Sequence, residues 1–189
     1  ASNKVSLSKY KLDFVTSGRM SPRVAIHLRR GNGAKGSFSS RKHSPDTYFF
    51  SIIEIIRDRF PDAEVHAYPS LGLSDGATMT DGPDYDGYRK RNVTLHFQND
   101  MLASWANMIS ADIFVMSHSV YSSVPALLSQ NCVVYDPFWF GKLSRYLTMH
   151  SMKEKMSSCY QSDAPTSRRK KGMAGKGGSP PIFVTRGPR

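Results

Sequence analysis

Apolar residues recur along this chain with two different spacings between residues 23 and 135. Short runs rich in β-branched and aromatic side chains are typical of buried strands, whereas apolar positions three or four apart are typical of one helix face. The pattern predicts strands at 23–29, 64–68, 93–97, 113–116 and 132–135, and helices at 46–59, 100–110 and 119–129. Because strands and helices alternate, we expect an α/β fold, a Rossmann-like parallel sheet with helices on both faces.

Capping and breaker residues mark the expected ends of several elements. Asp46 is a plausible N-cap for the first helix, and Pro61 follows its end. Pro69 is expected to end the strand that begins at residue 64, because proline has no backbone N–H to donate. Residues 69–91 then form a long polar loop, which is usually functional or disordered.

Composition divides the chain into a folded part and two flanking segments. Residues 1–20 carry no clear pattern and are interpreted as an N-terminal remnant or linker. Residues 21–150 hold the alternating elements, and residues 151–189, rich in Ser, Gly and Lys/Arg, predict a disordered basic tail. No apolar run is long enough to span a membrane.

The positive charge is concentrated in the tail. The whole chain has a net charge of +11, but residues 150–189 hold nine Lys/Arg and two Asp/Glu, which leaves +4 for residues 1–149. A uniformly basic domain would indicate nucleic-acid binding, and a mildly basic domain with a basic tail favours it much less. A basic nucleic-acid-binding protein is therefore the least favoured function.

The two cysteines do not form a recognisable disulfide framework. Cys132 lies in an apolar run, where a buried free thiol is the usual case, and Cys159 lies in a polar region. We therefore expect no disulfide between them.

The first candidate site is the end of the strand 23–29, which reads His27-Leu28-Arg29-Arg30-Gly31. Arginine is always charged, and its planar fork matches phosphate oxygens. Side chains alternate along a strand, so His27 and Arg29 share one face while Arg30 points the other way. The alternative is a pair of structural arginines in salt bridges with Asp or Glu, and the residue types alone do not decide between the two.

The second candidate site is the serine-rich turn Ser117–Ser123, which lies between a strand and a helix. Hydroxyl groups and free backbone N–H groups at a helix N-terminus can bind an anion, although Ser119 or Ser122 could equally be an ordinary N-cap. In a parallel sheet this turn emerges at the same edge as Arg29. Two groups that favour anions on one rim indicate a diphosphate ligand, with Ser117, Ser119 and Ser122 among its contacts.

The other motifs in the sequence are weaker evidence of function. His118 lies beside serines, but the Gly-x-Ser-x-Gly elbow of hydrolases is absent. The six histidines show no metal-ligand spacing, so we expect no metal site. The triplet Asn92-Val93-Thr94 matches an N-glycosylation acceptor, but it overlaps a predicted strand, and such triplets are common by chance.

Both candidate sites resemble motifs of one enzyme family. Ile26-His27-Leu28-Arg29-Arg30-Gly31 resembles the His-x-Arg-Arg-Gly motif of the α1,2-, α1,6- and protein O-fucosyltransferases, and residues 110–122 resemble the strand and Ser-rich turn of their second motif. The resemblance spans roughly residues 20–137 and implies the donor-binding, C-terminal half of a GT-B glycosyltransferase.

The resemblance implies a donor, site roles and a compartment. Residues 21–150 would bind a nucleotide sugar, most often GDP-fucose, for transfer to a glycan or protein acceptor without a metal or other cofactor. Arg29 would be catalytic on the β-phosphate, His27 would lie near the nucleoside, and Ser119 with neighbouring N–H groups would hold the phosphates. The family also implies the Golgi or ER lumen.

The sequence departs from the family pattern at three points. Asn32 replaces the usual acidic residue after Arg-Arg-Gly, no Asp or Glu occurs between Gly31 and Pro45, and Ser104 stands where some relatives carry an aspartate. The acceptor-binding half would have to lie before residue 1, so we interpret the chain as a fragment or a divergent member. A non-catalytic nucleotide- or glycan-binding module on the same fold is the alternative function.

Overall fold

The computed structural model describes residues 9–14, 21–30, 44–71, 84–97, 100–135 and 146–160. Within these ranges the strands are β1 (Arg23–Arg30), β2 (Glu64–Leu71), β3 (Val93–Leu95), β4 (Ile113–Val115), β5 (Cys132–Val134) and β6 (Tyr146–Leu147). The helices are α1 (Asp46–Arg59), α2 (Tyr85–Lys90), α3 (Met101–Ser110), α4 (Val120–Leu128), α5 (Met149–Lys155) and the 3₁₀ turn η3 (Met156–Ser158). No helix in these ranges is long and apolar enough to cross a membrane.

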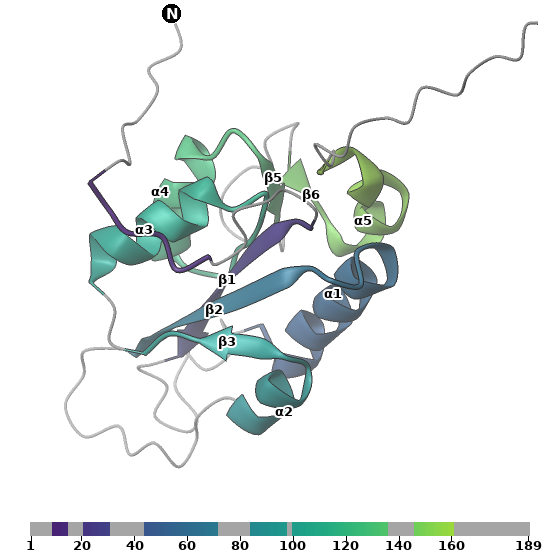
Figure 1. The fold of residues 1–189 in the computed structure, drawn as a ribbon, viewed down its shortest axis with the longest axis horizontal. Coiled ribbons are helices and arrows are strands. Elements are labelled where there is room, and N and C mark those ends of the chain that lie inside the picture. The colour runs from purple at the N-terminus through teal and green to yellow at the C-terminus, as the bar shows by residue number, and fades with distance from the viewer. Residues whose placement is uncertain are drawn as a thin grey trace, which may run out of the picture.

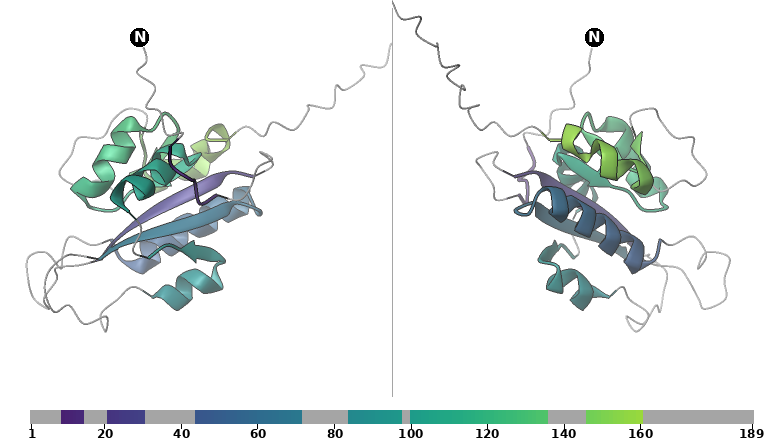
Figure 2. Two further views of the ribbon diagram at one scale, coloured as in Figure 1. Left: turned by 60° about the vertical axis from the view of Figure 1, so that its left-hand side comes forward. Right: turned by 90° about the vertical axis from the view of Figure 1, so that its right-hand side faces the viewer.

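The six strands form one sheet in the order β3-β2-β1-β4-β5-β6, and every neighbouring pair is parallel. This is the strand order of doubly wound nucleotide-binding folds. Helices α3 and α4 lie together on one face of the sheet, and α1 lies on the other (Figures 1 and 2). The predicted α/β class, parallel sheet and two-sided helix layers are therefore confirmed.

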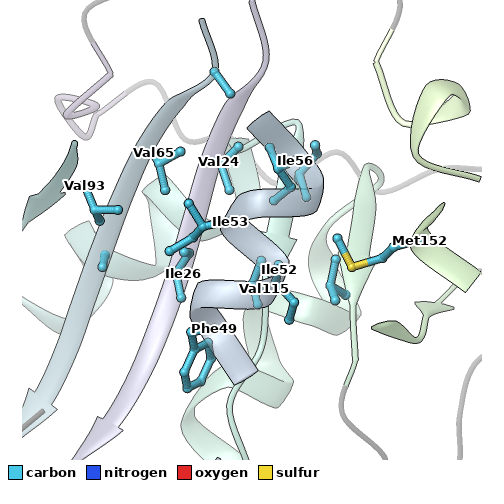
Figure 3. Packing of buried hydrophobic residues seen from close by; sticks show 14 of the residues in the cluster. Val24, Ile26, Phe49, Ile52, Ile53, Ile56, Val65, Val93, Val115 and Met152 are labelled. Carbon is cyan, nitrogen blue, oxygen red and sulfur yellow. The ribbon is translucent and has the colours of Figure 1, made fainter. Parts of the chain in front are cut away.

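One face of the sheet is sealed by α1. Its buried side chains are spaced three or four residues apart and lie over β1 and β2 (Figure 3). The helix contributes Phe49, Ile52, Ile53 and Ile56, each 0% exposed, and the sheet contributes Val24, Ile26 and Val65. Helix α5 adds Met152 to the same cluster. This spacing is the pattern from which the helix was predicted.

The opposite face is a second apolar layer beneath α3 and α4. Ala25 and Phe114 of the sheet pack there with Met108 of α3 and Ala126 of α4. Strand β1 therefore contributes to both layers, and each of its residues from Val24 to Leu28 is fully buried. Burial on both faces explains why this strand is a nearly continuous apolar run rather than an alternating one.

The N-cap of α1 differs from the prediction. The N-cap residue is Pro45, which makes no side-chain cap, and Asp46 is the first residue of the helix. The Asp46 carboxylate instead accepts hydrogen bonds from the Asp84 backbone N–H at 3.0 Å and from the Tyr88 hydroxyl at 2.8 Å. Asp46 therefore fastens the start of α2 to the start of α1.

Strand β2 also continues past the proline that was expected to end it. It pairs with β1 as far as Leu71, whereas β3 pairs with β2 only as far as Ala67. Pro69 therefore lies beyond the end of β3, on the edge of β2 that faces away from β1. Proline is tolerated on such an edge, because its missing N–H is not needed there for strand pairing. Part of the polar loop predicted over residues 69–91 is regular structure, since residues 69–71 belong to β2 and residues 85–90 form α2. Residues 72–83 lie outside the described residues.

Secondary structure continues beyond residue 150, where the composition changes. Strand β6 adds a sixth strand to the sheet, and α5 packs near α1 before η3 ends at Ser158. Thr148 caps α5 through a reciprocal capping box with Ser151. The disordered basic tail was predicted over residues 151–189, but residues 151–158 are helical, in α5 and η3. Residues 161–189 lie outside the described residues.

The expectation of a free thiol at Cys132 is wrong. Cys132 and Cys159 form a disulfide, with their Cα atoms 5.4 Å apart. Sequence patterning missed it because Cys159 directly follows η3, an element that was not predicted, and the fold brings the end of η3 beside the start of β5. The bridge ties the last helical segment covalently to the sheet.

The N-terminal segment 9–14 attaches to β2 and α3. The Asp13 backbone N–H donates to Asn107 Oδ1 at 2.8 Å, and the Tyr68 hydroxyl donates to Asp13 Oδ2 at 3.2 Å. The Phe14 ring lies 5.0 Å from the ring of His66. These contacts place the segment against both β2 and α3.

Two histidines meet beneath this segment. His96 Nε2 and His66 Nδ1 are 2.8 Å apart, His66 Nε2 lies 3.1 Å from Glu64 Oε1, and His96 Nδ1 lies 3.5 Å from Asp13 Oδ2. Burial lowers the pKa of His66, and His96 lowers it further, against the opposing effect of Glu64. Burial also lowers the pKa of His96, while Asp13 opposes it. The nitrogens that face each other share one proton, and a second proton would break their hydrogen bond.

Shortening a core side chain of α1 tests the packing. We expect Ile53→Ala to lower the free energy of unfolding by about 3 kcal/mol, because it removes buried methylene groups and leaves a cavity. Leu127→Ala is the matched control, since Leu127 is 58% exposed. Urea denaturation would measure both, and equal stability of the two variants would contradict the packing described for α1.

Removal of the disulfide tests its contribution to stability. The cysteines are separated by 27 residues. We expect the Cys132→Ala/Cys159→Ala double variant to unfold with about 3 kcal/mol less free energy than the oxidised wild type, because the unfolded chain gains the freedom of an open loop. Reduced wild type should behave like the variant. If both match the oxidised protein in urea denaturation, the bridge makes no contribution.

Acidification tests the histidine pair. Since the pKa values of His66 and His96 are lowered on folding, their contribution to stability is complete above the usual value of 6.5. It is lost as the pH falls below 6.5, where the unfolded chain binds protons that the folded chain refuses. We expect the melting temperature of His96→Gln to depend less steeply on pH between 7 and 5 than that of wild type. His150→Gln, at an exposed position of α5, is the control and should keep the wild-type slope.

Candidate functional site

The candidate site lies where the strand order of the sheet reverses. Strand β1 pairs with β2 on one side and with β4 on the other, so the chain leaves β1 and β4 in opposite directions across the sheet. In doubly wound folds this divergence leaves a crevice at the carboxyl ends of the two strands, where ligands bind. Of the two motifs singled out in the sequence, His27–Arg30 forms the carboxyl end of β1, and Ser117–Ser123 lies after the end of β4.

His27 joins three strands at this rim. It is 0% exposed, and its Nδ1 lies 2.7 Å from Ser117 Oγ while its Nε2 lies 3.0 Å from Ser70 Oγ. The centroids of the His27 and Tyr121 rings are 4.8 Å apart. The His27 ring therefore fixes the end of β1 to Ser117 in the turn after β4 and to Ser70 of β2. Its expected role beside a nucleoside remains a prediction.

Arg29 faces the serine-rich turn, as the alternation of the strand predicts. Its Nη1 lies 3.5 Å from the His118 backbone oxygen and 3.5 Å from Ser119 Oγ. The guanidinium is half-buried and therefore held partly away from water. Arg30 is the last residue of β1, and its side chain lies outside the described part of the structure.

The turn itself is braced by its own serines. Ser119 is the N-cap of α4, and its hydroxyl accepts a hydrogen bond from the Tyr121 backbone N–H at 3.2 Å. The Ser122 hydroxyl is 0% exposed and donates to the backbone oxygens of Ser117 and Ser119, both at 3.0 Å. The N-capping interpretation of Ser119 is thus confirmed, and Ser122 holds the shape of the turn from inside.

Capping and anion binding are compatible at this helix. The first turn of α4 contains no acidic residue. No negative side chain in that turn offsets the positive end of the helix dipole, and this end lies beside the permanently charged Arg29. A cation and a helix N-terminus that converge on one spot favour a ligand with more than one negative charge.

An aromatic wall that was not predicted lies next to the turn. Tyr121 stands between His27 and Trp105, with ring centroids 4.8 Å and 5.6 Å away, respectively. Burial raises the pKa of the Tyr121 phenol, against a hydrogen bond from Ser104 that lowers it. Tyr121 could have been found from the sequence, because it lies inside the serine-rich turn. Ser70 could not, since its strand was expected to end at Pro69.

Some of the remaining predictions for the site concern described residues, and the others concern residues outside the described part of the chain. Among the described residues, no group of three or more His, Cys, Asp or Glu side chains could hold a metal ion. Asn32 and most of the loop behind it, residues 31–43, lie outside the described residues. Ser104, noted as a departure from the family, is buried on α3 and contacts the aromatic wall.

No protein-family model matches the sequence, and no curated protein matches it. Three-dimensional comparison finds a distant and partial likeness to solved structures of POFUT1. A crystal structure of POFUT1 in complex with GDP-fucose is similar with a TM-score of 0.35 and 17% identity, over 70% of this chain and 43% of that chain.

Two further POFUT1 structures show the same degree of similarity. For a complex with GDP, the TM-score is 0.34 at 17% identity, over 72% of this chain and 45% of that chain. For an apo form, the values are 0.31 and 20%, over 57% and 38%. This chain therefore spans less than half of the POFUT1 chains it matches.

Proposed function

We propose that this chain is the donor-binding domain of a fucosyltransferase-like glycosyltransferase, with a nucleoside diphosphate sugar, most simply GDP-fucose, as its donor. One observation carries the proposal: the Arg29 guanidinium lies 3.5 Å from the N-cap hydroxyl of α4 at the point where the strand order reverses. A diphosphate supplies the two adjacent negative charges that this pair of groups favours. The family resemblance of both motifs supplies the choice of sugar and base.

Arg29 has a direct role in the proposed transfer. The bond between the anomeric carbon and the β-phosphate oxygen breaks, and its electron pair leaves with the diphosphate. An acceptor hydroxyl oxygen bonds to the anomeric carbon and gives up its proton. Charge grows on the leaving diphosphate during this step, and a fixed guanidinium lowers the barrier by stabilising that charge. No metal is needed for this role.

The other predicted residues would orient the donor. Ser119 and the N-terminus of α4 would contact the phosphates. His27, Ser117 and Ser122 would act as positioning residues, because their side chains already bond to one another or to the turn. Tyr121 and Trp105 would border the site with aromatic surface. Arg30 stays a predicted phosphate contact.

The acceptor and compartment follow the same proposal. The acceptor would be a hydroxyl group of a glycan or a protein, and the compartment would be the Golgi or ER lumen. The Cys132–Cys159 disulfide supports an oxidising compartment, because disulfides are rare in reducing ones.

A non-catalytic nucleotide-binding module is the second candidate. Asn32 favours it, because an acidic residue is usual at that place in the family motif. Both candidates require the same binding of the diphosphate, and they differ only in whether the bound nucleotide sugar is turned over. Transfer or hydrolysis of GDP-fucose by the purified chain, lost in Arg29→Ala, would identify the enzyme.

Removal of the guanidinium tests the donor site. We expect wild type to bind GDP in calorimetry, and Arg29→Ala to bind it more weakly by about 2 kcal/mol, roughly thirtyfold in Kd, because charge-assisted hydrogen bonds to phosphate are lost. GMP should bind more weakly than GDP to wild type and should lose less on the substitution.

Arg89→Ala is the matched control for this experiment. It removes the same charge from an exposed position on α2, where Arg89 pairs with Asp86. It should therefore keep wild-type affinity for GDP. Equal affinities of wild type and Arg29→Ala would remove Arg29 from the site, and absence of GDP binding by both would contradict the donor site as a whole.

A further inference from the structure

The turn between α2 and β3 carries an acceptor triplet for N-glycosylation. Asn92-Val93-Thr94 is the one Asn-x-Ser/Thr triplet in the 189-residue sequence. It begins at the residue just before β3 and continues into the first two residues of that strand. In the sequence alone, the overlap with a strand counted against a modification.

The structure shows that this overlap does not bury the required side chains. Asn92 and Thr94 are exposed, whereas Val93 between them is 5% exposed and belongs to the apolar core. Strand alternation is the reason, because it turns Val93 inward and Thr94 outward. The two side chains that the modification requires are therefore both on the surface.

The backbone of Asn92 is fixed while its carboxamide is available. Asn92 has a φ of 52°, its N–H donates to the Arg89 oxygen at 2.8 Å, and its own oxygen accepts from Arg57 Nη2 at 3.0 Å. Both hydrogen bonds use backbone atoms, and within the described part of the chain the carboxamide takes part in none. The amide nitrogen thus projects from a rigid turn.

The left-handed backbone offers a simpler reason for an asparagine here, since asparagine tolerates this conformation better than most residues. That reason explains Asn92 but leaves the exposed Thr94 two positions later unexplained. The Cys132–Cys159 disulfide adds a second, independent observation. Disulfides persist in the oxidising secretory compartments, where N-glycans are also attached.

We propose that Asn92 is an N-glycosylation site. In the step, the Asn92 Nδ2 bonds to the anomeric carbon of an oligosaccharide carried on a lipid diphosphate. The bond from that carbon to the diphosphate breaks, the lipid diphosphate leaves with the electron pair, and the amide nitrogen loses one proton. The lipid-linked oligosaccharide is the donor, an oligosaccharyltransferase of the secretory pathway catalyses the step, and the Thr94 hydroxyl is the group that this enzyme recognises.

The position of the glycan is compatible with the proposed donor site. Asn92 precedes the first residue of β3, at the amino end of the parallel sheet, whereas Arg29 and Ser119 lie at the carboxyl ends of β1 and β4. Strand β3 is an edge of the sheet, below β2 and above α2 in Figure 1. A glycan there would shield an edge strand, which could otherwise pair with another chain.

The test is the mass of the whole chain secreted from eukaryotic cells behind a secretory signal, before and after an enzyme that removes N-glycans. We expect a shift equal to one glycan, located at Asn92 by peptide mass spectrometry. Asn92→Gly should abolish the shift and keep the fold, because glycine also adopts a positive φ. Thr94→Val should abolish it through loss of the hydroxyl alone.

Val93→Ile is the matched control, since it changes the buried middle residue of the triplet but keeps both required side chains, and it should remain glycosylated. Melting temperatures of the variants, compared after deglycosylation, confirm that each is folded. Secreted wild type without a glycan at Asn92 would overturn the proposal, as would a shift that persists in Asn92→Gly. None of these outcomes depends on whether the chain binds GDP.

Discussion

The structure depends on the burial of β1 between two parallel neighbours and two apolar layers. Val24, Ile26 and Leu28 face the layer beneath α1, and Ala25 and His27 face the side of α3 and α4. Because β1 is enclosed on both faces and along both edges, its side chains reach the surface only near the ends of the strand, and Arg29 lies near the carboxyl end. Strand β2 on one side and β4 on the other then set the point where the sheet order reverses. The rim is thus a consequence of core packing.

At that rim, a few polar contacts convert a crevice into a defined site. His27 links β1 to Ser117 and Ser70, so three strands share one rigid end. The Ser122 hydroxyl holds the backbone of the turn by a hydrogen bond to the Ser119 oxygen, and the Ser119 hydroxyl caps α4 beside Arg29. Arg29 and the N-terminus of α4 are therefore held in place by the fold itself, so the proposed binding of an anion there would require little ordering.

Much of this arrangement could be predicted because it follows from local spacing. The apolar periods gave α1, α3 and α4 to within a residue, and the carboxyl ends of parallel strands must share an edge, so Arg29 and the serine-rich turn were expected to meet. What could not be predicted rests on pairs far apart in sequence. Cys132 meets Cys159 only because η3 returns to the sheet, and Asp13 meets His96 only because an N-terminal segment crosses β2. The periodic spacing of apolar residues contains no information about such long-range contacts.

The disulfide has a consequence for how the protein withstands proteases. The bridge closes the chain from residue 132 to residue 159 into a covalent ring. A single cut anywhere inside that ring would leave two pieces that stay joined, with α5 still tethered to β5. A protease that nicked this part of the molecule would therefore change its mass pattern under reducing conditions while its folded halves remained together.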